Sequence, residues 1–346
     1  MSTAETRTQV GAGTAAVEQP RRMPGLVPVT ETLRTVARRP PEPLARPAGE
    51  DAGEDAGENT GGVIGTPAAG GRRVGAFWRL LGSELSLTFR RPRNMALLAV
   101  LGVVPIILGI GLRLASGTAG DGEMGGIVQN LTGNSLMLTF LSFSFLVLLL
   151  MPVAVSVVAG DAIAGEAGGG TLRYLLAAPA GRGRLLAVKY LNAVVFGYAV
   201  TAVVAVTALL TGLALFPGGS VTLLSGTTIT MGEGLLRILL AVGYVGAAMA
   251  ALAAVALALS TFTEVAIGAI AGTLVLLVVC QVVRAVPALD PVTPYLLPTR
   301  FTAFDGVLRD PVDFAALRDG LLSFAAYIAL FGSIAWARFS GKDITS

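Results

Sequence analysis

Long apolar stretches alternate with short polar segments through most of this chain. A helix of about 18 or more apolar residues can cross a hydrocarbon core about 30 Å thick. Runs of that length cover residues 95–112, 135–159, 188–213, 235–259, 265–283 and 317–337. Alternating segments of about ten residues, which are typical of membrane β-barrels, are not visible. The pattern predicts an all-α polytopic membrane protein with six transmembrane helices in residues 95–340.

The segment just before the first run has the periodicity of an amphipathic helix. Its large apolar residues recur at helical spacing, and polar residues occupy the rest of the helical wheel. The apolar residues are Trp78, Leu81, Leu85 and Phe89. Trp78 suits the headgroup boundary, and Pro92 is expected to end the helix. We therefore expect an amphipathic helix in the membrane interface over residues 72–94; the alternative is a linker that only supplies positive charge.

The first part of the chain, residues 1–71, is rich in Ala, Gly, Pro, Glu, Arg and Thr. A segment with so few large apolar residues cannot bury enough surface to offset the entropy of ordering. It also shows no short apolar segment of the signal-peptide type. We expect a disordered cytoplasmic tail, which either is dispensable or binds a regulatory partner.

Composition supports membrane insertion and argues against catalysis. The chain is 53% hydrophobic and 14% charged, whereas soluble domains are about 25% charged. It has no histidine, which excludes His-dependent acid-base chemistry and imidazole metal ligands. The single Cys280 lies inside an apolar run, and neither lysine stands in a P-loop context. We expect no catalytic residue, no metal site and no cofactor bound by this chain.

Charges within the apolar runs are few and lie near their ends. Arg237 is the deepest, about one turn into the fourth run, where its side chain could reach the surface. Ion-coupled transport usually needs ionisable groups at mid-membrane, so this distribution disfavours it. Two prolines, Pro105 and Pro152, are expected to kink the first and second spans.

The loops differ in their content of basic residues, which predicts the orientation of the chain. Basic residues are concentrated before the first span, between the second and third, and after the sixth. They are Arg72, Arg73, Arg79, Arg90, Arg91, Arg93, Arg173, Arg182, Arg184, Lys189, Arg338 and Lys342. The other loops have fewer, mixed with acidic residues. Because cytoplasmic loops carry the excess of Lys and Arg, both termini are predicted to be cytoplasmic in a bacterial plasma membrane.

The polar insert at residues 160–189 has an order that the charge bias alone does not explain. A glycine run at 168–170 permits a sharp reversal, and Thr171 can cap a following short helix. That helix would run to about Ala178 before Pro179 ends it. Such a helix, with an apolar face and flanking charges, would suit docking to a soluble partner.

The insert resembles the cytoplasmic loop of ABC-2 type exporter permeases. The shared pattern is G-E-x-x-x-G-T-L-R-x-L-L-x-x-P-x-x-R-x-x-L-x-x-x-K, which begins at Gly165 and ends at Lys189. The six-span layout extends the resemblance over residues 72–340. The resemblance implies a membrane subunit that pairs with a separate ABC ATPase, which would bind ATP and Mg. It also implies a second permease copy, either this same chain in a homodimer or a related chain. It implies contact with membrane lipid and none with nucleic acid.

The resemblance also implies two functional regions. The residues implied to couple the loop to the ATPase are Glu166, Thr171, Leu172, Arg173, Leu175, Leu176 and Arg182. The outer segment 284–317 would form short re-entrant helices that close the exit. The candidate gate residues in this segment are Pro294, Pro298, Phe301 and Phe304.

The function that follows is export of a hydrophobic or amphipathic substrate, such as a drug, a secondary metabolite or a lipid. Scattered hydroxyl and amide groups in the apolar spans fit such cargo, although they also fit ordinary helix packing. An ion-coupled secondary transporter and a sodium-extruding ABC permease remain alternatives. A membrane-embedded enzyme or a structural membrane protein is a third.

Overall fold

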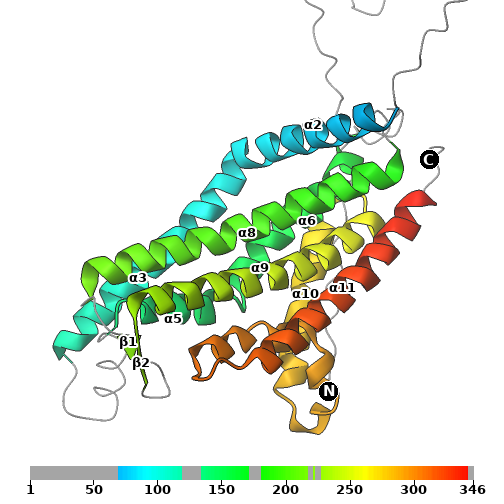
Figure 1. Ribbon diagram of the computed structural model, residues 1–346. Helices are drawn as coiled ribbons and strands as arrows, with labels where there is room; N and C mark the ends of the chain where they lie inside the picture. The colour runs from blue at the N-terminus through cyan, green and yellow to red at the C-terminus, as the bar shows by residue number, and fades with distance from the viewer. Residues whose placement is uncertain (1–68, 119–133, 171–180, 217–220, 223–226, 342–346) are drawn as a thin grey trace, which may run out of the picture. The chain divides into compact units, whose positions relative to one another are not determined.

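The structure is a computed structural model that describes residues 69–118, 134–170, 181–216, 221–222 and 227–341. The main helices are α2 (Ala69–Arg90), α3 (Pro92–Thr118), α5 (Met137–Leu146), α6 (Leu150–Gly168), α8 (Arg182–Leu215), α9 (Met231–Phe262), α10 (Ala266–Arg284) and α11 (Phe314–Ser340). Six of them, α3, α6, α8, α9, α10 and α11, are long and apolar enough to cross a membrane (Figure 1). The predicted fold class is confirmed. The predicted tail up to residue 68 lies outside the described residues.

Helix α9 is the centre of the helix packing. It contacts α6, α8, α10 and α11, and 72% of its most apolar window is buried, against 17% in α10 and α11. Its buried stretch is rich in alanine, from Ala247 to Ala258. Small side chains allow neighbouring helix backbones to approach closely. The outer faces of α3, α10 and α11 carry exposed Val, Leu and Ile side chains, as expected of surfaces in contact with lipid.

The second apolar run, predicted as a single span, is divided into two helices. Helix α5 ends at Leu146, and α6 begins at Leu150 after a break whose last residue, Leu149, has φ −139° and ψ −60°. Pro152 follows in the first turn of α6, where a missing backbone N–H costs nothing. The proline thus lies after a complete break instead of kinking one continuous helix. Pro105, in contrast, lies inside α3.

The chain turns between α2 and α3, as predicted from Pro92 (Figure 1). Arg91 is the only residue between the two helices, and Pro92 is the first residue of α3. The apolar face of α2 is partly covered by protein, because α2 packs on α8. Leu81 is 4% exposed, and the Phe89 ring lies 5.9 Å from that of Phe196 on α8. Trp78 is 61% exposed and remains available to the headgroup region.

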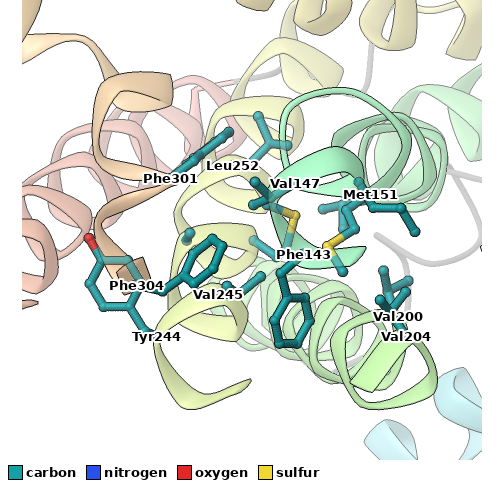
Figure 2. Close-up of a cluster of buried hydrophobic side chains, with 14 of the residues drawn as sticks. Phe143, Val147, Met151, Val200, Val204, Tyr244, Val245, Leu252, Phe301 and Phe304 are labelled. Atoms are coloured by element: carbon teal, nitrogen blue, oxygen red, sulfur yellow. The ribbon is translucent and has the colours of Figure 1, made fainter. Parts of the chain in front are cut away.

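The hydrophobic core joins the broken span to the connector between α10 and α11 (Figure 2). Phe143 of α5, Val147 of the break and Met151 of α6 pack beside Val200 and Val204 of α8 and beside α9. A short antiparallel pairing of β1 (Val221–Thr222) with β2 (Thr228–Ile229) precedes α9. This two-residue ladder is the only strand pairing in the part of the chain that the structure describes.

Candidate functional site: a charged cluster beside the predicted coupling loop

The predicted coupling loop leaves α6 and enters α8 next to a buried ion pair. Lys189 Nζ, on α8, lies 2.5 Å from Glu166 Oε1, on α6, and 3.7 Å from Glu84 Oε1, on α2. The Lys189 side chain is only 4% exposed, whereas those of Glu84 and Glu166 are 18% and 22% exposed. A buried ammonium needs such partners because desolvation without compensation is costly. Lys189 therefore connects α8 to both α6 and α2 through ion pairs.

Buried amides and a hydroxyl continue the cluster toward the α2–α3 turn. Asn192 Nδ2 donates to Thr88 Oγ1 at 2.9 Å, and Asn94 Nδ2 donates to the Thr88 backbone oxygen at 2.9 Å. Asn192 is 5% exposed, and its Oδ1 has no hydrogen-bond partner among the described residues. A buried acceptor of this kind is uncommon in a folded protein. A hydrogen-bond donor placed next to Asn192 Oδ1 would therefore be stabilised.

A second set of ion pairs joins the α2–α3 turn to α6. Arg91 Nη1 and Arg93 Nη2 each lie 2.8 Å from Asp161 Oδ2. The arginines are about half exposed, and the Asp161 side chain is 15% exposed. Asp161 is five residues before Glu166, so α6 contributes two anchored carboxylates within its last turns.

The same residues surround a cavity of about 300 Å³. Its walls come from α2, the start of α3, α6 and α8. They carry charges of both signs: the acidic residues Glu84, Asp161 and Glu166 and the basic residues Arg91, Arg93 and Lys189. The apolar Leu87 and Val158 also line it. The arrangement can bind a polar group while leaving an apolar edge for an attached chain.

A side chain from α9 also binds the backbone of α6 in this region. Ser260 Oγ accepts hydrogen bonds from the backbone N–H groups of Ile163, at 3.2 Å, and Ala164, at 2.9 Å. It donates to the Gly160 carbonyl at 2.7 Å. The end of α6 that carries Asp161 and Glu166 is therefore fixed by α9.

Of the implied coupling residues, only Glu166 and Arg182 belong to the described residues. Thr171, Leu172, Arg173, Leu175 and Leu176 lie in 171–180, outside them. Arg182 Nη1 donates to the Ser340 carbonyl at 2.8 Å. The first residue of α8 is thus attached to the last residue of α11, a link that the sequence pattern did not suggest.

The four candidate gate residues lie in the connector between α10 and α11. This connector consists of four short 3-10 helices: η1 (Pro287–Leu289), η2 (Thr293–Tyr295), η3 (Leu297–Arg300) and η4 (Ala303–Leu308). Pro294 is exposed, whereas Pro298, Phe301 and Phe304 are buried. The Phe304 ring lies 5.8 Å from Phe143, and Phe301 lies 6.4 Å from Phe324 of α11. The two phenylalanines therefore insert into the core and hold the connector against the helices (Figure 2).

Arg237 binds the connector from the start of α9. It is 4% exposed and donates to the Val307 and Arg309 carbonyls at 2.9 and 2.8 Å. It also pairs with Glu233 at 2.8 Å and Asp310 at 3.7 Å. Its side chain thus reaches protein groups of the connector instead of the membrane surface. Only its depth in the apolar run pointed to it, because its connector partners Val307, Arg309 and Asp310 lie about 70 residues away along the chain.

The connector also contains one titratable group with a shifted pKa. Desolvation raises the pKa of the Asp305 carboxyl above its ordinary value, and the Arg309 guanidinium offsets part of that shift. Within the described ranges, no group of three or more His, Cys, Asp or Glu side chains is arranged to hold a metal ion.

The helices and their apolar outer faces define a polytopic helical membrane protein. The chain belongs to the family described as "Protein of unknown function (DUF2705)", whose model matches residues 124–345. It is also 35% identical over 115 residues to the "Probable ABC transporter permease protein NosY" of Stutzerimonas stutzeri. The aligned region is 33% of this chain and 37% of that protein.

Proposed function

We propose that this chain is the membrane-spanning permease subunit of an ATP-binding cassette exporter driven by a separate ATPase subunit. The observation that carries the proposal is the Glu166–Lys189 ion pair, because these two residues stand at the two ends of the coupling-loop pattern. A soluble partner that moved residues 171–180 would pull on α6 and α8 together. The similarity to a probable ABC permease over a third of the chain supports the same interpretation.

The division of roles follows from the pattern. Leu172, Leu175 and Leu176 would pack into the ATPase, and Glu166, Thr171, Arg173 and Arg182 would fix the position of the loop. The ATPase would bind ATP and Mg, and a second permease copy would complete the pathway. Export through the plasma membrane, with both termini cytoplasmic, completes the proposal.

The exit would be closed by the connector at 284–317. Phe301 and Phe304 are buried in the core, and Tyr244 Oη donates to the Arg300 carbonyl at 2.7 Å. These contacts support a gate whose opening requires α9 and α11 to move relative to the connector. The exposed apolar residues of the outer helices suit a hydrophobic or amphipathic substrate that enters from the bilayer.

Affinity purification tests the ATPase assignment. The full-length tagged chain is purified from native membranes, and its partners are identified by mass spectrometry. The expected partner is a soluble protein with a P-loop. ATP hydrolysis by the co-purified complex in lipid vesicles should fall in the Leu175→Asp variant and remain unchanged in Leu330→Asn, a change on the outer face of α11.

Two results would overturn the proposal. One is purification without any ATPase from membranes in which the chain is abundant. The other is transport of an amphipathic dye by vesicles that contain this chain alone and follow a proton or sodium gradient, which would indicate secondary transport.

A further inference from the structure

We propose that the cavity between α2, α3, α6 and α8 binds the headgroup of a phospholipid that carries both a phosphate and a primary ammonium. The cavity lies where the amphipathic helix α2 ends and the first membrane-spanning helix begins. A helix of this type lies at headgroup depth. The position thus brings a charged cavity to the level of the bilayer where lipid headgroups are found.

The phosphate would bind at the arginine side of the cavity. Arg91 and Arg93 are about half exposed, and each uses one terminal nitrogen for Asp161. A guanidinium has five N–H donors, so both retain donors for an anion. Arginine is well suited to phosphate because two of its donors can bind two phosphate oxygens.

The ammonium would bind at the carboxylate side. Glu84 has Lys189 as its ion-pair partner at 3.7 Å, which is longer than the Lys189–Glu166 contact at 2.5 Å. Its carboxylate therefore keeps acceptor capacity for a second cation. Asn192, in the same wall, has a buried Oδ1 without a partner among the described residues. A small rotation of the amide would let an ammonium N–H satisfy it.

One ligand can reach both sides of the cavity. The side chains of Glu84, Arg91 and Arg93 line the same space of about 300 Å³. The cavity charges balance, with three acidic and three basic residues, so a ligand with one charge of each sign is favoured over an anion alone.

An apolar edge favours a lipid over a soluble phosphate ester. Leu87 lines the cavity and is 58% exposed, and Met95, one turn into α3, is 49% exposed. Acyl chains attached to a bound headgroup would cover these side chains. Removing such apolar surface from water stabilises binding.

Native mass spectrometry of the full-length protein tests the proposal. Delipidated protein is exposed to an equimolar mixture of phosphatidylethanolamine, phosphatidylcholine and phosphatidylglycerol, and the retained lipid is measured. Phosphatidylethanolamine should be retained best. Phosphatidylcholine has no ammonium N–H, and phosphatidylglycerol has no cation. Neither lipid can therefore donate a hydrogen bond from an ammonium to the carboxylate side of the cavity.

Three variants separate the two sides of the cavity. The double variant Arg91→Gln, Arg93→Gln should lower retention of phosphatidylethanolamine about tenfold, because it removes charge-assisted hydrogen bonds. Glu84→Gln, which preserves shape, should reduce its preference over phosphatidylcholine. Arg90→Gln is the matched control, because Arg90 is an exposed neighbour that does not line the cavity.

Equal retention of the three lipids by the wild-type chain would overturn the proposal, as would a preference for phosphatidylglycerol. Equal retention by the Arg91, Arg93 double variant and by Arg90→Gln would also overturn it. If the double variant fails to fold, Glu84→Gln decides the question through selectivity. Displacement of the bound lipid by phosphoethanolamine at equal concentration would show that the ligand is a soluble ester.

Discussion

Lys189 Nζ and Glu166 Oε1 lie 2.5 Å apart and join α8 to α6 at the two ends of the predicted coupling loop. The ammonium is almost completely buried and has a second carboxylate, Glu84, at 3.7 Å. The three residues come from α2, α6 and α8. This cluster fixes the positions of the helices between which the loop is attached.

Replacing Lys189 with Met should lower the free energy of unfolding by about 3 kcal/mol, because it leaves two partly buried carboxylates without a cation. Glu166→Gln should cost less, since Glu84 remains near the ammonium. Denaturant unfolding in detergent micelles, followed by circular dichroism, measures both changes. Arg90→Met, an exposed cation on α2, is the control. Equal stability of the Lys189 and Arg90 variants would contradict the prediction.

The pair also shows what could and could not be predicted from sequence. The six spans follow from apolar run length, and Pro92 correctly predicted the turn between α2 and α3. Lys189 and Glu166 were both recognised as members of the loop pattern. Their direct contact was not predicted, because the pattern gives their order along the chain and not the packing of α6 against α8. Glu84 lies 105 residues before Lys189, in a helix interpreted as purely interfacial.

The break between α5 and α6 was missed for a related physical reason. Hydropathy is uniform across residues 146–150, so run length alone gives one continuous span. Pro152 was interpreted as a kink, although a proline in the first turn of a helix is compatible with a complete break before it. The buried positions of Phe301 and Phe304 likewise depend on the tertiary packing of the connector.

Ser260→Ala should destabilise the protein by about 1–3 kcal/mol, because it removes three buried hydrogen bonds between α9 and α6. Thermal unfolding in micelles gives the change. Thr261→Val is the matched control, since the neighbouring hydroxyl is equally buried but bonds only to Ala258 of its own helix. The Thr261 change should therefore be the smaller. The reverse order would mean that the α9–α6 bonds contribute little.

Gly160 is required for the close approach of α6 to α10. A Cβ at this position would lie 2.9 Å from Ile270 Cγ1 and 3.2 Å from the Ile270 backbone nitrogen. Gly160→Val should therefore cost about 1–3 kcal/mol through overpacking. Gly243, inside α9, has open space around a built Cβ, so Gly243→Ala should stabilise the protein by about 0.4–1 kcal/mol. Tolerance of valine at 160 would show that the two helices can separate freely.

Arg237 should stabilise the connector between α10 and α11 against local opening. Its guanidinium donates to two carbonyls of the connector and pairs with Glu233 and Asp310. Lysine keeps the charge but cannot direct separate donors at both carbonyls. In Arg237→Lys, hydrogen exchange of residues 303–310 should therefore accelerate about tenfold, since losing a charged hydrogen bond costs about 1.5–3 kcal/mol. Exchange near Lys189 should remain unchanged, because that ion-pair cluster shares no residue with the Arg237 contacts.

Glu233→Gln removes one exposed partner and leaves both carbonyl bonds intact, so the connector should exchange as in the wild type. Faster exchange in both variants would mean that the ion pair, and not the carbonyl bonds, holds the connector.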